Sequence, residues 1–364
     1  MSPSIRFPEF TGEWERCVLG DVLEFSNTRI NSSELNSGNY VSTENILQNF
    51  QGIVKARSIP EDTNVMAFSC GNILLSNIRP YLKKVWKATF NGGCSSDVFV
   101  LQANSNIDAD YLHYVVANDK FIGFVMNGAK GVKMPRGDKN QMKTYSLSLP
   151  SIKEQRKISR FLSFLDERIA VQSRLIEKLQ SLIGGIAQHC IKEAISGSMC
   201  IKLGDICKIT TGKLDANAQV DNGLYPFFTC AEQPFKIDNF AFDTEALLIS
   251  GNGANLGYVN YYNGKFNAYQ RTYVLDAFSE NIQYIKWALK VLLPKRIAIE
   301  KSSSNTPYIV LSTLSDLRLP IPSKGNQCHM AELMQSLERK LSNQIALKSS
   351  YNMLKQYLLR QMFI

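Results

Sequence analysis

The chain contains two copies of one pattern, and this internal duplication restricts the folds open to its 364 residues. The segment Leu19-Gly20-Asp21 recurs as Leu203-Gly204-Asp205. Further along, each copy has a short apolar run typical of a buried strand, Asn72–Ser76 in the first and Ala246–Ser250 in the second. A repeat this long indicates tandem duplication of a whole domain and excludes a solenoid of short repeats.

Each copy closes on a short strand, a proline and a long helical pattern. Tyr145–Pro150 corresponds to Asp316–Pro320, and the sequence from Gln155 onward aligns with the sequence from Gln327 onward. We therefore predict an α+β (mixed α/β) fold in which two tandem domains are each followed by a long helix. The predicted parts are domain 1 (1–150), a central helix (151–198), domain 2 (199–322) and a C-terminal helix (323–364).

Both helical patterns place apolar residues at alternating spacings of three and four, which is the heptad seam of a coiled coil. The first seam begins at Ile158, and the second begins at Met330 and continues through Leu347 and Leu354. Helices of roughly 35 residues are about 50 Å long, too long to bury their stripes against small domains. We therefore expect an antiparallel coiled coil that relates the halves by a pseudo-twofold axis. The predicted pairing residues are Leu162, Leu165, Ile169, Gln172, Ile176, Leu337, Leu341, Gln344 and Tyr351.

Two glutamines, Gln172 and Gln344, occupy equivalent seam positions in the two copies. One hypothesis is that they meet and fix the register of the pair, because a buried polar pair penalises slipped alignments. The alternative is that both face solvent or a partner protein. Replacing both by leucine tests the first hypothesis, which expects thermal stability to rise.

The chain carries a formal net charge of +9. A basic excess of this size suits a polyanionic partner, either nucleic acid or an acidic membrane surface. The basic residues are spread along the sequence without a Lys/Arg block, which favours a folded basic face over a disordered arm. On composition alone, a merely basic soluble protein is the alternative.

Eight cysteines and three histidines show no Cys-x-x-Cys pair and no zinc-ligand spacing. The N-terminal segment lacks the apolar run of a signal peptide, and no stretch of about 18 apolar residues could span a membrane. We therefore expect a cytoplasmic protein with no membrane partner, and with no metal or cofactor bound to this chain.

The order of these elements resembles the specificity (S) subunits of type I restriction–modification enzymes over essentially the whole chain. The resemblance rests on the opening Arg6–Trp14, on the step from Leu-x-Leu-Pro through Glu154-Gln155 into a heptad helix, and on the closing Asp316–Pro322. The second copy departs from it in two places. It lacks the leading tryptophan, and it has Ser323–Asn326 where the first copy has the Glu-Gln step.

The resemblance implies a non-catalytic protein whose two domains each read one half of a bipartite sequence in double-stranded DNA. It implies that the helices set the distance between half-sites and dock methyltransferase (M) subunits, two of them in all. Restriction/translocase (R) subunits would complete the complex. S-adenosylmethionine, ATP and magnesium are expected on those partner subunits and not on this chain.

Polar and cationic side chains gather after the predicted buried strands, and these are the groups that contact base edges and phosphates. In the first domain, one cluster follows Ser76 in the sequence and a second lies in a glycine-rich loop. In the second domain, the equivalent loop follows Ser250. A solvated loop is the alternative for each. The candidate DNA-binding residues are Asn77, Arg79, Tyr81, Lys83, Lys84, Lys87, Lys130, Lys133, Arg136, Asn252, Asn255, Tyr258, Tyr261, Tyr262, Lys265, Gln270 and Arg271.

Two alternative functions are a DNA methyltransferase and a coiled-coil scaffold. Asn305-Thr-Pro-Tyr308 resembles the Asn-Pro-Pro-Tyr motif of adenine methyltransferases, although its first proline is missing and no glycine-rich cofactor loop precedes it. On this view the chain is a self-contained DNA adenine methyltransferase with a degenerate motif, and it binds S-adenosylmethionine alone. The third possibility is a coiled-coil scaffold with protein-binding heads, which predicts no salt-dependent affinity for DNA.

Overall fold

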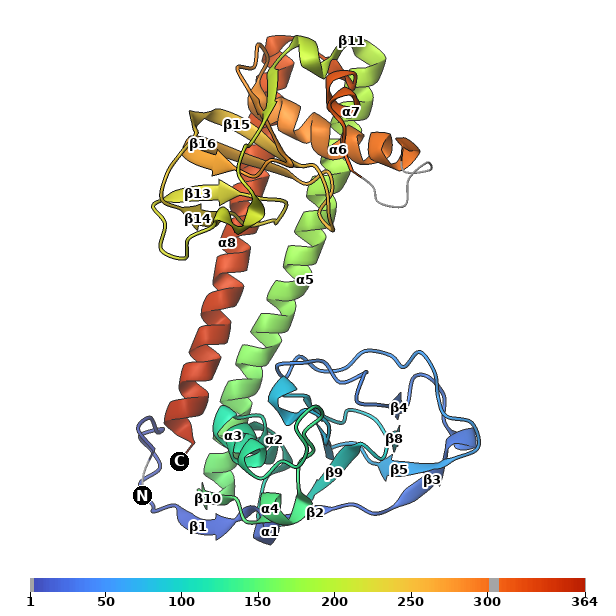
Figure 1. Cartoon of the computed structure of the whole chain (residues 1–364). Coiled ribbons are helices and arrows are strands. Elements are labelled where there is room, and N and C mark those ends of the chain that lie inside the picture. Colours follow the sequence, from blue (N-terminus) through green and yellow to red (C-terminus); the bar gives the residue numbers. More distant parts are fainter. Residues whose placement is uncertain (1–2, 301–307, 364) are drawn as a thin grey trace. The chain divides into compact units, whose positions relative to one another are not determined.

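The computed structural model describes residues 3–300 and 308–363, which divide into two compact units. Unit 1 comprises residues 3–172 and 347–363, and unit 2 comprises residues 173–300 and 308–346. Each unit contains a mixed α/β globule and one stretch of each of the long helices α5 (Ile152–Gly197) and α8 (Lys324–Met362) (Figure 1). The predicted fold class, with two globular domains and two long helices, is confirmed.

Unit 1 holds two four-stranded sheets, in the orders β2-β9-β6-β7 and β3-β5-β8-β4, and a strand pair β1-β10. Its strands are β1 (Glu15–Val18), β2 (Leu23–Phe25), β3 (Arg29–Asn31), β4 (Tyr40–Val41), β5 (Asn64–Phe68), β6 (Ile73–Ser76), β7 (Val85–Lys87), β8 (Gly92–Cys94), β9 (Val98–Ala103) and β10 (Ser146–Leu149). Its short helices are α1 (Leu19–Val22), α2 (Ala109–Val116), α3 (Asp119–Asn127), α4 (Lys139–Lys143) and the 3₁₀ turns η1 (Ser32–Glu34) and η2 (Pro80–Leu82).

Unit 2 holds a six-stranded sheet, in the order β12-β17-β15-β16-β13-β14, and a strand pair β11-β18. Its strands are β11 (Met199–Lys202), β12 (Lys208–Thr211), β13 (Tyr225–Phe228), β14 (Phe235–Ile237), β15 (Phe242–Ser250), β16 (Val259–Ala268), β17 (Thr272–Asp276) and β18 (Arg318–Ile321). Its other helices are α6 (Ile282–Glu300), α7 (Leu311–Ser315), η3 (Leu203–Asp205) and η4 (Ala216–Ala218).

The repeated Leu-Gly-Asp segment forms the same corner in both units. It follows the first strand of an antiparallel pair, β1 with β10 in unit 1 and β11 with β18 in unit 2. The leucine N–H donates to a carbonyl just before the closing strand, from Leu19 to Tyr145 at 2.8 Å and from Leu203 to Leu317 at 2.9 Å. The duplication read from the sequence is therefore a duplication of structure.

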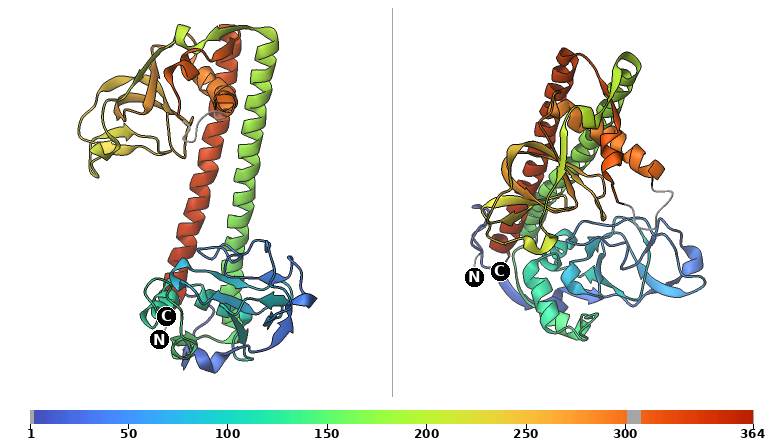
Figure 2. Two further views of the ribbon diagram at one scale, coloured as in Figure 1. Left: turned by 45° about the vertical axis from the view of Figure 1, so that its right-hand side comes forward. Right: turned by 45° about the horizontal axis from the view of Figure 1, so that its top comes forward.

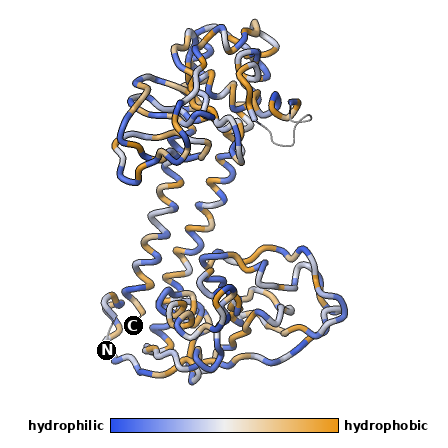
Figure 3. Tube along the Cα trace, in the orientation of Figure 1, coloured by the Kyte–Doolittle hydropathy of each residue, from blue (hydrophilic) through white to orange (hydrophobic). Residues whose placement is uncertain are grey.

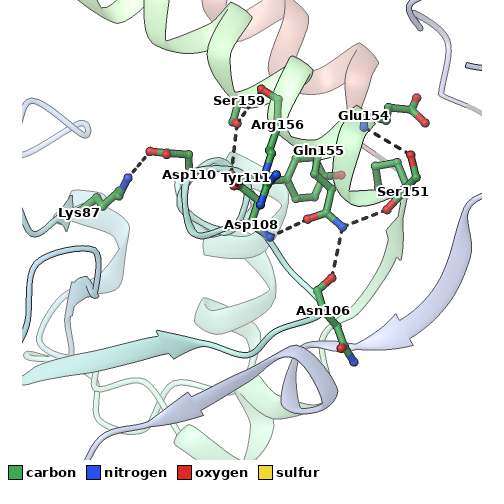
Figure 4. Close-up of polar contacts among 11 residues, drawn as sticks. Lys87, Asn106, Asp108, Asp110, Tyr111, Ser151, Glu154, Gln155, Arg156 and Ser159 are labelled. Carbon is green, nitrogen blue, oxygen red and sulfur yellow. Dashed lines mark hydrogen bonds and ion pairs between the residues drawn. The ribbon is translucent and has the colours of Figure 1, made fainter. Parts of the chain in front are cut away.

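A buried glutamine at the start of each long helix ties that helix to its globule. The Gln155 amide accepts from the N–H of Asp108, the N-cap of α2, at 2.8 Å, and donates to the carbonyl of Pro150 at 2.9 Å (Figure 4). In unit 2, Gln327 accepts from the N–H of Asn281 at 3.0 Å and donates to the carbonyl of Pro322 at 2.9 Å. Each glutamine thus joins three elements: the closing strand, the long helix and the helix that covers the sheet.

The two departures of the second copy have one physical cause. In unit 1 the buried Glu154 carboxylate accepts two hydrogen bonds from the Arg6 guanidinium, at 2.7 and 2.8 Å, and a third from the Trp14 indole at 3.3 Å. In unit 2 the residue before the buried glutamine is the exposed Asn326. Unit 2 lacks counterparts of Trp14 and Arg6 and so has no partners for a buried carboxylate, which explains why it also lacks a counterpart of Glu154.

Apolar residues recur at helical spacing along α5 and α8 (Figure 3). In unit 1 the N-terminal part of α5 shares a core with the C-terminal part of α8, through Leu162 and Leu358. In unit 2 the C-terminal part of α5 shares a core with the N-terminal part of α8, through Ile183 and Met334. Within each unit the two stretches run side by side (Figures 1 and 2) and in opposite directions, as an antiparallel pair requires.

Two lysines correct the predicted seam of the second helix. Leu347 and Leu354 are exposed, at 40% and 43%, whereas their neighbours Lys348 and Lys355 turn inward. Lys355 is 9% exposed, and its Nζ lies 2.5 Å from the Asp166 carboxylate of α5. Heptad counting missed this because a lysine can bury its stem and still satisfy its charge.

The predicted pairing residues face inward to different degrees. Leu162 and Gln172 are buried in unit 1, and Gln172 is 7% exposed. The other seven are half-buried: Leu165, Ile169, Ile176, Leu337, Leu341, Gln344 and Tyr351. The proposal that Gln172 and Gln344 fix the register stays a prediction.

Candidate nucleic-acid interface

The two basic clusters of the first domain lie together in the structure. Asn77 follows the buried strand β6, and its carbonyl accepts from the N–H of Gly137 at 3.1 Å, while the N–H of Arg79 donates to the carbonyl of Pro135 at 2.8 Å. The N–H of Asn77 donates to the carbonyl of Asp97, the residue before β9, at 2.8 Å. We call this meeting of three segments junction 1: residues 76–79, Asp97 and residues 130–137.

Unit 2 repeats three of these contacts within the residues that the structure describes. The N–H of Gly251 donates to the carbonyl of Arg271 at 2.8 Å, and the carbonyl of Gly251 accepts from the N–H of Ile309 at 2.8 Å. An isolated β-bridge pairs Asn252 with Tyr308, as one pairs Ile78 with Arg136 in unit 1. We call this junction 2: residues 250–252, Arg271 and residues 308–309.

Junction 1 concentrates exposed cations. Lys130, Lys133 and Arg136 are all exposed; Lys130 lies 2.8 Å from the Asp138 carboxylate, and Arg136 lies 2.9 Å from that of Asp97. The hydrogen bond with Asp138 raises the pKa of Lys130, so the group stays charged. Such exposed ion pairs hold their partners weakly, which leaves the cations able to meet an anion.

Two features of junction 1 reflect a constrained loop. Arg79 adopts a left-handed conformation with φ at 52°, which costs a non-glycine residue energy. The Asn77 Oδ1 and Arg79 Nε atoms are buried and have no hydrogen-bond partner within the described part of the chain. Buried polar atoms of this kind usually have a partner, so these two mark a place that a bound molecule or water would complete.

Three predicted lysines of the first cluster are engaged within unit 1. Lys83 pairs with Asp119 at 2.7 Å, Lys87 pairs with Asp110, and Lys84 donates to the carbonyl of Thr43 at 2.5 Å. Burial lowers the pKa of Lys84. The bond of Lys84 helps to hold the loop, whereas the ion pairs of Lys83 and Lys87 are partly exposed like those of junction 1 and equally weak. Tyr81 is 47% exposed.

In unit 2 the structure brings four predicted residues to junction 2. Asn252, Gln270 and Arg271 surround Gly251. The Asn255 amide donates to the carbonyl of Cys230 at 3.0 Å, and the Cys230 thiol donates to the Asn252 Oδ1 at 3.0 Å. Gln270 and Arg271 are exposed. They line a depression of about 210 Å³ whose wall is formed by Thr211, Gly251, Gln270, Arg271, Tyr273 and Ile309.

The other predicted residues of unit 2 are spread along β16 or lie just before it. Tyr258 adjoins junction 2, because its carbonyl accepts from the N–H of Ser250 at 3.0 Å. Tyr261 donates to the Glu245 carboxylate at 2.7 Å, Tyr262 packs against an apolar cluster of the unit, and Lys265 lies over the Phe240 ring. The structure therefore does not bring these last three to the junction.

Asp97 and Tyr308 complete the two junctions but are not among the predicted DNA-binding residues. Asp97 is not singled out from the sequence, and Tyr308 is considered only as part of the methyltransferase-like motif Asn305-Thr-Pro-Tyr308. The available signal was the repeat, since Tyr308 follows Pro307 as Arg136 follows Pro135. In the methyltransferase-like motif, Asn305, Thr306 and Pro307 lie outside the described residues.

Within residues 3–300 and 308–363, no three histidine, cysteine or acidic side chains are grouped as metal ligands. In the same residues, no helix is both long and apolar enough to cross a membrane.

Comparison with known proteins gives one family. The family model for the type I restriction modification DNA specificity domain matches twice, over residues 11–181 and 196–348. The EcoDI specificity subunit of Escherichia coli is 42% identical over 137 residues, which span 38% of this chain and 30% of that relative. The MjaVIII specificity subunit of Methanocaldococcus jannaschii is 23% identical over 388 residues, covering 92% of this chain and 87% of that relative.

Solved structures give the same fold. The S subunit of a type I restriction-modification system from M. genitalium matches with a TM-score of 0.69 at 19% identity, over 100% of this chain and 99% of that one. A chain from a study of complex assembly in the type I R-M system matches with a TM-score of 0.59 at 19% identity, over 96% of this chain and 97% of that one. At these identities the matches establish the fold.

Proposed function

The chain belongs to the type I restriction modification DNA specificity family, and from this premise we propose that it is the DNA-reading subunit of a type I restriction–modification complex. The observation that carries the proposal is the repeated junction. Each match of the DNA specificity model covers one junction, and the two copies expose different hydrogen-bonding side chains on one backbone framework.

We assign one half of a bipartite DNA target to each unit. Cations such as Lys133 and Arg136 suit phosphates and guanine, and the net charge of +9 favours a polyanion throughout. Two copies of one framework that expose different side chains suit two different half-sites. The antiparallel helices would set the distance between them.

The outer faces of the long helices are the surface on which partner subunits would dock. Large apolar side chains lie outside the seam and remain exposed, among them Phe164 at 50% and Leu182 at 54% on α5, and Met353 at 63% and Tyr357 at 50% on α8. Exposed apolar residues gathered along an element favour a protein partner. Two methyltransferase (M) subunits and the restriction/translocase (R) subunits are the partners that the family implies.

We assign the chemistry to those partners, so that this chain is not itself an enzyme. The methyltransferase subunits would bind S-adenosylmethionine and modify adenine, and the restriction subunits would use ATP and magnesium. This chain would choose the site.

Modification mapping tests the proposal. The chain is expressed with a cognate methyltransferase subunit in a host that lacks DNA methylation, and modified adenine is mapped across the genome. A bipartite motif with an unread spacer is expected. A stable complex that methylates nothing would contradict the proposal, and binding of S-adenosylmethionine by the isolated chain would favour the methyltransferase alternative.

A further inference from the structure

The junctions make the two units comparable position by position. Because the backbone bonds match, Asp97 stands where unit 2 has Arg271, and Arg136 stands where unit 2 has Tyr308. Unit 1 therefore presents the carboxylate of Asp97 and the guanidinium of Arg136. Unit 2 presents the guanidinium of Arg271 and the aromatic hydroxyl of Tyr308. The framework is common to both, and the difference lies in the side chains that it displays.

All four of these side chains reach solvent. The Arg136 and Asp97 side chains are 53% and 32% exposed, although their charged groups lie 2.9 Å apart. Tyr308 is 56% exposed, and Arg271 is exposed too. An ion pair this open is worth little in water, so a base edge could replace either partner at small cost.

The carboxylate of Asp97 is the most informative of the four. A negative charge beside Arg136 weakens the attraction of junction 1 for phosphates, so it is out of place on a surface that only holds the DNA backbone. A carboxylate is, however, a hydrogen-bond acceptor for the amino group of cytosine, and a guanidinium is a bidentate donor to guanine. An Asp–Arg pair therefore suits the reading of a G·C base pair.

Junction 2 has room for a different reading. Gly251 replaces Asn77, and a Cβ atom there would meet the carbonyl oxygen of Arg271. Glycine thus lets the two backbone segments approach closely, and Gly251 and Arg271 both line the depression of about 210 Å³. Arginine suits guanine, and the tyrosine ring and hydroxyl offer an apolar contact and one hydrogen bond.

We propose that Asp97 with Arg136, and Arg271 with Tyr308, are the equivalent base-reading pairs of the two units. Each pair determines at least one base of the half-site that its unit recognises. This inference rests on the proposed function and assigns it to four side chains.

The test uses the complex of this chain with its methyltransferase subunit. Arg136→Gln and Arg271→Gln each replace a cation by a neutral hydrogen-bonding group. Discrimination at one base pair should fall roughly tenfold to hundredfold in one half-site, while the other half-site is unchanged. The two variants should affect opposite halves, as measured by methylation of sites that differ from the target at single positions.

Two charge-matched controls keep the result specific. Arg57→Gln and Arg318→Gln remove exposed cations of unit 1 and unit 2 that lie outside the junctions, and they should leave both half-sites unchanged. Asp97→Asn and Tyr308→Phe change the same pairs with almost no change in volume, and should relax the same halves. Protection of the Gly137 and Ile309 amides from hydrogen exchange shows that each junction is still folded.

Two results would overturn the proposal. One is a folded Arg136→Gln or Arg271→Gln variant that keeps its full target sequence. The other is affinity that weakens equally for every sequence with a smaller salt dependence, because a phosphate contact behaves in that way. A wild-type complex that yields no bipartite motif counts instead against the proposed function.

Discussion

Replacing the buried Gln155 by leucine should loosen unit 1 and leave unit 2 intact. Gln155 is 1% exposed and bonds to three backbone groups: the N–H of Asp108 at 2.8 Å and the carbonyls of Pro150 and Asn106 at 2.9 and 3.4 Å. Leucine fills the space but bonds to none of them. Since each buried group left without a partner costs about 1–3 kcal/mol, and the bond to Asn106 is long, the expected loss is about 3 kcal/mol.

Urea unfolding measures the total loss, and hydrogen exchange shows where it falls. The Gln155→Leu variant should lose protection at the start of α2, and Gln327→Leu should lose it at the start of α6, because Gln327 makes the matching bonds in unit 2. Gln180→Leu, at an exposed position of α5, should change stability by less than about 0.5 kcal/mol. Unfolding of Gln155→Leu at the wild-type urea concentration would refute the reasoning.

Three further perturbations probe other parts of the chain. Burial lowers the pKa of His113 from 6.5 to about 4, so unit 1 should lose stability as the pH falls from about 6.5 through 4; a difference in unfolding free energy between wild type and His113→Gln that is constant with pH would contradict this. Gly185→Ala in α5 should stabilise the protein by up to about 1 kcal/mol, because a Cβ there has no neighbour within 4 Å. Gly212→Ala should destabilise it, because its Cβ would overlap the Ala268 carbonyl. Melting temperatures of both variants equal to that of the wild type would argue against this reasoning. Deleting one heptad from each long helix removes about 10 Å and should shorten the unread DNA spacer by about 3 base pairs. An unchanged spacer in modification mapping would refute the proposal that the helices set the distance between the half-sites.

Features with a local or periodic cause could be predicted from the sequence. The heptad pattern and the two Leu-x-Leu-Pro steps placed both long helices, because apolar periodicity depends only on neighbouring turns. The repeat of Leu19-Gly20-Asp21 placed the two corners, because the same residues make the same backbone bonds in each copy.

Features that depend on contacts between distant segments could not be predicted. Nothing near Asn77 in the sequence indicates that it meets Gly137, and nothing near Lys83 and Lys87 indicates that they pair with Asp119 and Asp110. For the same reason the sequence could not show that Tyr262 packs against an apolar cluster of unit 2 and away from junction 2.

The most direct test of the account exchanges one recognition domain. Residues 199–322 are replaced by the corresponding segment of a type I specificity subunit with a different target, and the chimera is mapped with the same methyltransferase subunit. The account predicts a new bipartite motif in which one half-site is exchanged and the other is retained. A motif that changes in both halves, or in neither, would contradict the claim that each unit reads its own half of the target.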